Sequence, residues 1–278
     1  MLCALLTGIL TSQAGSLVQL GTRNILSSPS TLGFEALTVF WLLLIHAAGL
    51  FLIDSGWLFL LGIPLFIGLA IFTSKFLGKE SSLERVILLG LTFNLLMGAI
   101  FSLWHFFFLA LNLPFPLEVW FGHFRLAEVS SFIWVLSAEM IMIVFYFFYE
   151  RRIYLYSLGD EWGRGLRTQE RSLFHFIFTA AILSTYVIVT LFGAFAFLGL
   201  IFPIIARKLW FSRLDMRGEF LLGALVNGGI LMVIDAFCYH FPIAGAELPV
   251  GLLMAIVGAV SLILILWRSS RASQLLAK

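Results

Sequence analysis

Seven polar side chains interrupt otherwise apolar stretches of the sequence: Glu35, His46, Asn94, His105, Glu139, Asn227 and Asp235. Long apolar stretches suit a membrane, and polar groups inside a membrane are costly. Each of the seven is therefore considered first as a functional residue. Their positions are scattered and lack the pairing of a proton relay. Glu35 and His105 lie next to expected loops, where interfacial water can solvate them. For Glu139 and Asp235, hydrogen bonding inside a helical bundle is the favoured interpretation.

Other chemistry is not indicated by the sequence. The five histidines lack the spacing of a zinc or haem site, and the two cysteines, Cys3 and Cys238, are expected to be packed thiols. The sequence has no G-x-x-x-x-G-K-[ST] phosphate loop and no G-x-S-x-G elbow. We therefore expect no enzyme activity, no metal and no cofactor. If the protein moves a substrate uphill, the energy must come from another component.

The longest polar interval runs from Glu150 to Arg171. Asp160 and Glu161 precede Arg164 and Arg167 in it, an order that suits the dipole of a short helix. Two interpretations are equally supported by composition: a solvated loop, or a helix that receives force from a cytoplasmic partner.

Composition sets the class of the protein that carries these residues. Of the 278 residues, 61% are hydrophobic and 12% are charged, whereas a soluble domain carries about 25% charged residues. This composition excludes a soluble enzyme, a nucleic-acid-binding protein and a disordered chain. The sequence predicts an all-α, polytopic integral membrane protein that forms a single domain over residues 1–278.

Uncharged runs predict about nine transmembrane segments, because each crossing needs about 20 residues. The run Ser172–Ala206 would reach roughly 52 Å as one helix, while the hydrocarbon core is about 30 Å thick. We therefore expect a turn near Phe192-Gly193 and two short passes. The other segments are Met1–Thr22, Ala36–Ile53, Ser55–Ser74, Val86–Leu117, Val129–Tyr149, Phe220–Ile234 and Leu248–Trp267.

This segmentation places 16 of the 17 lysines and arginines on one face and only Arg125 on the other. By the positive-inside rule, the cation-rich face and the C-terminus are cytoplasmic. Met1 is then outside, so we expect either insertion with the N-terminal end outside or a preceding helix that this chain lacks. Within the first segment, Ala4, Gly8, Ser12 and Ser16 recur every four residues, which predicts close approach of another helix.

Four ordered blocks resemble the FecCD-type permeases, the membrane subunits of type II bacterial ABC importers for iron–siderophore chelates, haem and cobalamin. The first runs from Gly15 to Gly33, and the second is similar to the cytoplasmic L-G-E-E-x-A-R-x-L-G motif. The third, Phe197 to Arg207, is similar to F-V-G-L-I-x-P-H-x-A-R. The fourth consists of Asp235 and, further along the chain, a Glu-Leu-Pro-Val-Gly sequence that begins at Glu247.

The sequence departs from the family pattern at several positions. Ile25 stands where the family has proline after Asn24, Ile204 replaces a histidine, and Tyr239 replaces an arginine. Arg167 replaces the second glycine of the cytoplasmic motif. Family members usually have ten helices, and this chain matches from the second helix onward, which agrees with a missing first helix.

The resemblance implies the type II ABC importer permease fold, an ATP-driven importer in the bacterial inner membrane, and a ferric siderophore as the substrate. It implies as partners a dimer of ABC ATP-binding subunits, a substrate-binding protein on the outer face and a second permease subunit, with no nucleic acid. The coupling loop would span about 150–171. Its candidate ATPase-coupling residues are Leu158, Gly159, Asp160, Glu161, Arg164, Leu166 and Arg167.

The resemblance also implies residues for structure or translocation, which are Gln19, Asn24, Pro29, Gly33, Gly199, Pro203, Arg207, Asp235, Glu247, Pro249 and Gly251. Arg125, the one cation of the outer face, is a candidate contact for the binding protein. Alternatives remain at this stage: a haem or cobalamin permease, a secondary transporter driven by an ion gradient, or a truncated permease without function.

Overall fold

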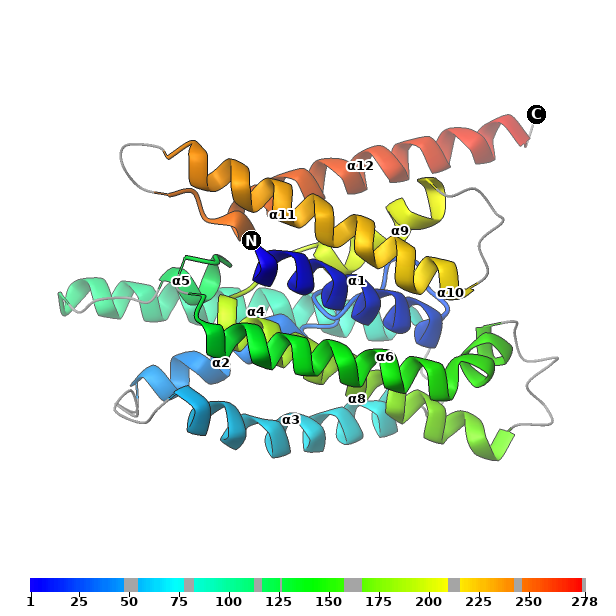
Figure 1. Ribbon diagram of the computed structural model, residues 1–278, viewed down its shortest axis with the longest axis horizontal. Coiled ribbons are helices and arrows are strands. Elements are labelled where there is room, and N and C mark those ends of the chain that lie inside the picture. The colour runs from blue at the N-terminus through cyan, green and yellow to red at the C-terminus, as the bar shows by residue number, and fades with distance from the viewer. Residues whose placement is uncertain are drawn as a thin grey trace.

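The computed structural model describes residues 1–47, 55–77, 83–112, 117–125, 127–157, 167–209, 216–242 and 247–276. In these ranges the chain forms helices and short connections without any β-strand, so the all-α prediction is confirmed (Figure 1). The helices are α1 (Leu2–Thr22), α2 (Phe34–Ala47), α3 (Ser55–Leu77), α4 (Leu83–Ala110), α5 (Leu117–Trp120), α6 (Val129–Ser157), α8 (Arg167–Phe192), α9 (Leu198–Leu209), α10 (Met216–Gly218), the π-helix η3 (Glu219–Gly223), α11 (Ala224–His240) and α12 (Val250–Leu276).

Within the described ranges, five helical stretches are long and apolar enough to cross a membrane, and they lie in α1, α4, α6, α8 and η3–α11. Shorter apolar stretches lie in α2, α3, α9 and α12. Together they correspond to the nine predicted segments. The expected turn is confirmed, because α8 ends at Phe192 and Gly193 adopts a φ of 84°. Gly193 is followed by α9, whose 12 residues extend only about 18 Å, so α9 is a half-helix.

The polar interval is more helical than the sequence indicated. Its first residues continue α6 to Ser157, and its last residues open α8 at Arg167. Ile153 explains the extension of α6, since its side chain is fully buried against the bundle and gives the polar end of the helix an apolar contact. Residues 158–166, the middle of the predicted coupling loop, lie outside the described residues.

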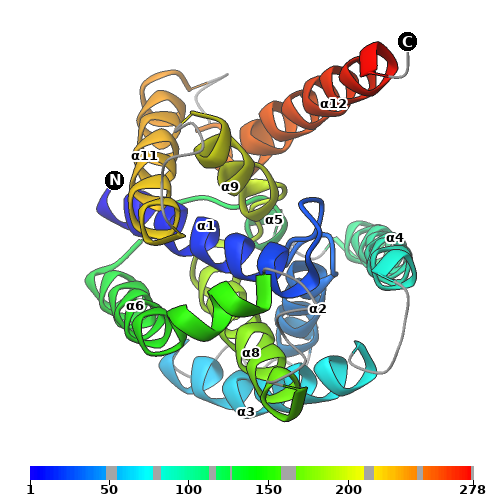
Figure 2. The same cartoon turned by 90° about the vertical axis from the view of Figure 1, so that its right-hand side faces the viewer.

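The first helix of the chain is the central one. In its apolar window, 83% of the residues are buried, compared with 6% for the window in α4. Helices α6, α8, α9 and α11 surround α1, whereas α4 and α12 project from the bundle (Figure 2). Large apolar side chains on these two helices are exposed, among them Leu95, Phe106, Ile256 and Ile263. Such faces suit lipid or another membrane subunit.

The row of small residues on α1 packs against α11, as predicted. A Cβ on Gly8 would lie 2.8 Å from the Cα of Gly228 and 3.0 Å from the carbonyl oxygen of Asn227. One turn further along α1, Ser12 Oγ accepts a hydrogen bond of 2.7 Å from Asn227 Nδ2. Small side chains thus allow the two helices close contact, and a buried amide adds a specific link between them.

The two ends of the bundle differ in charge. Figure 1 shows α1, α3, α6, α9 and α12 finishing at the same end, where α4, α8 and α10 begin. Every lysine and arginine in the described ranges belongs to these helix ends or follows them directly, except Arg125, which follows α5 at the opposite end. We call the first the cation-rich end and the second the outer end. The predicted one-sided distribution of cations is confirmed for the described residues.

We expect Gly8→Leu to destabilise the bundle, because the added side chain would meet the backbone of α11. Overpacking of this kind typically costs about 1–3 kcal/mol. Gly229→Leu is the matched control, since a Cβ at Gly229 meets no atom within 4 Å. Thermal unfolding of the two purified variants, followed by size-exclusion chromatography, measures the difference. Equal stability of Gly8→Leu and Gly229→Leu would contradict the packing role of Gly8.

Candidate functional site

The first and third sequence blocks meet where α1 crosses the start of α9. A Cβ on Gly15 would lie 1.8 Å from the carbonyl oxygen of Gly199, so the two backbones touch and only glycine fits. Pro203 explains why that oxygen is available, because proline has no N–H to donate to the carbonyl four residues earlier. Gly15 thereby brings its Cα hydrogen to an oxygen that the helix leaves free, a weak but favourable contact.

Two further contacts complete this intersection, which we call the motif junction (Gly15, Gln19, Pro29, Gly199 and Pro203). Gln19 Nε2 donates a hydrogen bond of 3.0 Å to the carbonyl oxygen of Leu200 in the first turn of α9. A Cβ on Gly199 would lie 3.3 Å from Cδ of Pro29. Residues separated by about 180 positions in the sequence are therefore in direct contact, and both blocks supply glycines or polar groups that the contact needs.

The connection between α1 and α2, residues 23–33, folds back along α1 to reach the motif junction. It starts at Arg23, whose φ of 51° reverses the chain, and Asn24 Oδ1 accepts a hydrogen bond of 2.9 Å from the N–H of Leu26. It ends at Gly33, where a φ of 85° favours glycine. Inside a membrane, non-helical backbone is stable only where protein buries it and satisfies its polar groups.

Helix α4 supplies part of that cover. Asn94 Nδ2 donates a hydrogen bond of 2.8 Å to the carbonyl oxygen of Ser30. A Cβ on Gly90 would lie 2.3 Å from the carbonyl oxygen of Thr31, so the connection packs directly on the α4 backbone. Asn94 therefore satisfies an interior carbonyl group, a structural role that its position in an apolar segment left open.

At the cation-rich end, α1 is attached to the end of α6. The guanidinium of Arg23 lies 4.7 Å from the centre of the Tyr156 ring, and Arg23 Nη2 donates a hydrogen bond of 3.1 Å to the Tyr156 carbonyl oxygen. The Tyr156 hydroxyl in turn donates to the carbonyl oxygen of Gly21 at 3.2 Å. We call this set of contacts the Arg23–Tyr156 clamp. It lies beside Ser157, the last residue of α6.

A second polar group joins α1, α9 and η3. Arg207 Nε donates a hydrogen bond of 2.6 Å to Glu219 Oε1, and Ser16 Oγ donates to the same oxygen at 3.2 Å. Glu219 opens the π-helix η3, a geometry that is rare and often occurs at functional sites. Nearby, Arg217 of α10 pairs with Glu150 of α6. Two ion pairs and the Ser16 hydrogen bond thus link α1, α6, α9 and α10–η3 at one end.

The fourth block lies at the outer end, in contact with two other connections. The Gly251 N–H donates to the Gly122 carbonyl oxygen at 2.8 Å, and the Gly122 N–H donates to the Ala194 carbonyl oxygen at 2.9 Å. A Cβ on Gly251 would lie 2.6 Å from the nitrogen of Gly122, so a larger residue does not fit. The Pro249 carbonyl oxygen accepts from the N–H of Leu252 and starts α12. Glu247 is exposed beside these contacts of Gly251 and Pro249.

Two other acidic residues of the apolar segments, Glu139 and Asp235, each contact another group of the chain. Glu139 of α6 is almost fully buried, and the Gln13 side chain of α1 hydrogen-bonds to it. Asp235 Oδ2 lies 3.4 Å from the Met1 nitrogen. The contact with Gln13 agrees with the predicted structural role of Glu139 in the bundle. In the part of the chain that the structure describes, no three His, Cys, Asp or Glu side chains are grouped as a metal site would require.

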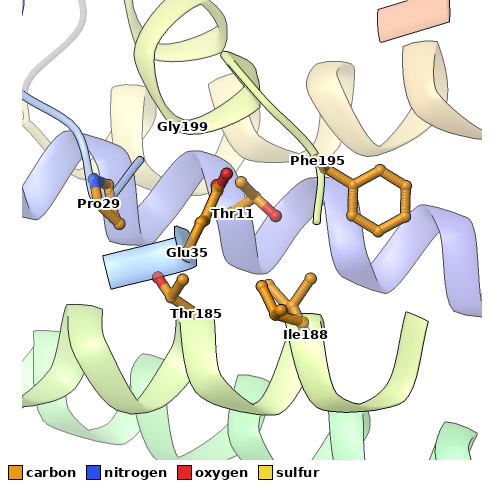
Figure 3. A pocket seen from close by; sticks show the side chains of 8 residues that line it. Thr11, Pro29, Glu35, Thr185, Ile188, Phe195 and Gly199 are labelled. Atoms are coloured by element: carbon orange, nitrogen blue, oxygen red, sulfur yellow. The ribbon is translucent and has the colours of Figure 1, made fainter. Parts of the chain in front are cut away.

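Glu35 differs from these residues, because no described residue hydrogen-bonds to or pairs with its carboxylate. It lies in the first turn of α2 and lines a cavity with Thr11, Thr185 and Gly199, as Figure 3 shows. The start of a helix stabilises a carboxylate by about 0.3–1 kcal/mol, whereas desolvating an unpaired charge costs several kcal/mol. The start of the helix alone therefore compensates for only part of the cost of an ionised, desolvated Glu35.

The predicted site residues fall into four groups. The motif junction brings together Gln19, Pro29, Gly199 and Pro203, with Asn24 and Gly33 in the connection beside it. Arg207 joins the charged group at the cation-rich end. Asp235, Glu247, Pro249, Gly251 and the exposed Arg125 lie toward the outer end. Of the predicted coupling residues, Leu158, Gly159, Asp160, Glu161, Arg164 and Leu166 lie outside the described residues, and Arg167 is the first residue of α8.

Sequence analysis did not identify Tyr156, Glu219 or Gln13. Tyr156 lies in the polar interval that begins at Glu150, and its pairing with Arg23 spans 133 positions. Glu219 could have been noticed as an acidic residue 12 positions after Arg207 and beside a predicted crossing. Gln13 follows Ser12 in a helix rich in small residues, and no pattern in the sequence distinguishes it.

Comparisons with known proteins cover nearly the whole chain. Residues 1–268 match the FecCD transport family. The petrobactin import system permease protein FatD of Bacillus anthracis is 28% identical over 98% of this chain and 80% of its own length. The iron(3+)-hydroxamate import system permease protein FhuG of Bacillus subtilis is 25% identical over 96% of this chain and 81% of its own.

The fold is also similar to solved structures. An inward-facing, metal-chelate type ABC transporter superposes with a TM-score of 0.78 and 20% identity, over 96% of this chain and 84% of that one. The similarity confirms the predicted permease fold. Together with the family match over residues 1–268, it shows that this multi-pass membrane protein belongs to the FecCD transport family.

Proposed function

We propose that the chain is the permease subunit of an ATP-driven importer and that it translocates an iron chelate of the ferric siderophore class. The observation that carries the proposal is the motif junction, because two of the family blocks are in contact there through the residues that define them. The names of FatD and FhuG, a petrobactin and an iron(3+)-hydroxamate permease, support the substrate class.

The proposed location is the cytoplasmic (inner) membrane of a bacterium, with the cation-rich end and the C-terminus in the cytoplasm. Lysine and arginine are retained on the cytoplasmic side of multi-pass proteins, and the described cations gather at the end where α12 finishes. The outer end, with Arg125, then faces the substrate-binding protein. An exposed ion pair there would contribute less than about 1 kcal/mol, so Arg125 is one contact among several.

A dimer of ABC ATP-binding subunits would dock at the cytoplasmic face between α6 and α8, against residues 158–166 and Arg167. The Arg23–Tyr156 clamp supports this placement, because it connects the end of α6 to α1, the most buried helix of the bundle. A displacement of the docked segment would then reach α1 and, through the motif junction, α9. Rigid movement of packed helices is a common mechanism of such switches.

A second permease subunit, identical or related, would pack against the exposed apolar faces of α4 and α12. These helices have few contacts within the chain, and their large side chains are exposed over most of their described length. The chelate would cross between the two permease subunits. The permease itself would contribute no bond chemistry, and its energy would come from ATP hydrolysis by the partner.

Affinity purification of the tagged chain from its native membrane tests the proposal. We expect an ABC ATP-binding subunit at a ratio of one per permease chain, identified by mass spectrometry, and ATPase activity that a substrate-loaded binding protein stimulates. Recovery of the stable chain with neither ATP-binding subunit nor binding protein would contradict an ATP-driven importer.

The orientation can be measured with single cysteines in a background where Cys3 and Cys238 are replaced by alanine. We expect Arg125→Cys to react with an impermeant maleimide added to the outside of cells. Arg151→Cys, at the exposed cation-rich end of α6, should react only after the membrane is permeabilised. The opposite pattern of labelling would overturn the assigned orientation.

The clamp predicts a coupling defect. Arg23→Ala removes a ring contact and a charged hydrogen bond, worth together about 1–2 kcal/mol, so we expect stimulation of ATPase activity by the binding protein to fall about tenfold. Assembly with the ATP-binding subunit should persist. Tyr156→Phe, which retains the ring but loses the bond to Gly21, should have a smaller effect. Arg151→Ala is the control, and a defect equal to that of Arg23→Ala would argue against the clamp.

A further inference from the structure

The cavity beside Glu35 lies in the interior of the bundle, between α1, α2, α8 and the connection from α8 to α9 (Figure 3). Its volume is about 10 Å³, which is the space that a single water-sized species requires. An iron chelate is far too large for it. The cavity is therefore not the transport path, and whatever occupies it is small.

The polar atoms of the cavity offer lone pairs and no free proton. The Thr11 hydroxyl already donates to the Thr7 carbonyl oxygen at 2.5 Å, and the Thr185 hydroxyl donates to the Ala181 carbonyl oxygen at 2.8 Å. Each hydroxyl has one hydrogen, so only its acceptor capacity remains. An ionised carboxylate also accepts only. The cavity thus presents oxygen acceptors to its occupant.

The charge of Glu35 has no counterpart in the lining. The Glu35 side chain is partly buried, and of the residues that line the cavity from α1, α2, α8 and α9, Glu35 alone is titratable or charged. A buried carboxylate without a partner is strongly unfavourable and is neutralised by a proton or a cation. Hard oxygen ligands of this kind prefer hard cations.

The position of the cavity fits the same conclusion. It lies beside two interruptions of helical structure: the connection 23–33, represented by Pro29, and the break before α9, represented by Phe195. Membrane transporters hold small ions where helices are interrupted, because the backbone there leaves room and polar groups. Neither interruption supplies a positively charged side chain to the cavity.

We propose that the cavity binds one small monovalent cation, a proton or Na⁺, between the Glu35 carboxylate and the hydroxyl oxygens of Thr11 and Thr185. The bound cation joins α2 to α1 and α8 at the level of the motif junction. A proton would reside on a carboxylate oxygen and donate to a threonine hydroxyl, whereas Na⁺ would be coordinated by all three groups. This site is independent of the chelate and of the ATP-binding subunit.

Infrared difference spectroscopy of the purified full chain in lipid nanodiscs tests the site, with spectra recorded across a pH series in choline chloride and in NaCl. If the occupant is a proton, a carboxylic acid band disappears at alkaline pH in both salts and is absent from Glu35→Gln. If it is Na⁺, NaCl shifts the carboxylate bands at constant pH, and radioactive sodium binds at one ion per chain. Glu35→Gln abolishes both of these sodium signals.

Two variants make the result specific. Glu139→Gln is the matched control, because Glu139 is also a buried carboxyl group but has Gln13 as a partner; it should retain the signals assigned to Glu35. Thr185→Val keeps the shape of the side chain and removes one ligand, so we expect either a shifted acid band or about tenfold weaker sodium binding. Spectra and sodium binding that Glu35→Gln leaves unchanged would overturn the proposal. If Glu35→Gln does not fold, spectra and sodium binding that Thr185→Val leaves unchanged would overturn the proposal instead.

Discussion

The backbone contact between Gly15 and Gly199 depends on a constraint that a membrane imposes more strictly than water does. Within the hydrocarbon core, every carbonyl oxygen needs a partner from the protein. Pro203 leaves the Gly199 oxygen without its helical partner, and α1 comes close enough to cover it because Gly15 has no side chain. Gln19 adds a donor to the neighbouring carbonyl of Leu200. The break before α9, the buried connection 23–33 and the central position of α1 all follow from this intersection.

Two features that depend on length and charge, a turn in one long apolar run and the gathering of cations at one end, are predicted by the sequence and confirmed for the described residues. The run Ser172–Ala206 was too long for one crossing, and the chain turns at Gly193. The cations gather at one end because membrane insertion sorts them. The helix ends were less predictable: α6 continues to Ser157 because Ile153 finds an apolar contact, which depends on tertiary packing and not on local composition. The family resemblance identified Gln19 and Gly199, but their contact spans 180 positions, and no periodicity in the sequence encodes it.

Helix α1 connects the functional regions of the molecule because it packs against α6, α8, α9, η3 and α11. Near its start Gly8 touches α11, in its middle Gly15 touches α9, and at its end Arg23 and Gly21 contact Tyr156 of α6. A tightly packed helix transmits displacement with little loss, since protein interiors are dense and compress little. The charged group around Glu219 adds a second link between α1 and the η3 end of α11. The π-helical geometry of η3 at this link is rare and often occurs at functional sites.

The Glu35 site would add a thermodynamic link to this mechanical one. Its ligands come from α1, α2 and α8, and the start of α9 closes the cavity. Any movement that separates these helices would also separate the oxygens that hold the cation, so the cation binds the packed arrangement more tightly than an opened one. Linkage then requires that the cation stabilise the packed arrangement by the same free energy. Release of the cation leaves an unpaired carboxylate, which favours an opened arrangement where water can reach Glu35. An acidic residue at an interrupted helix can therefore bias the equilibrium between two states without contacting the transported chelate.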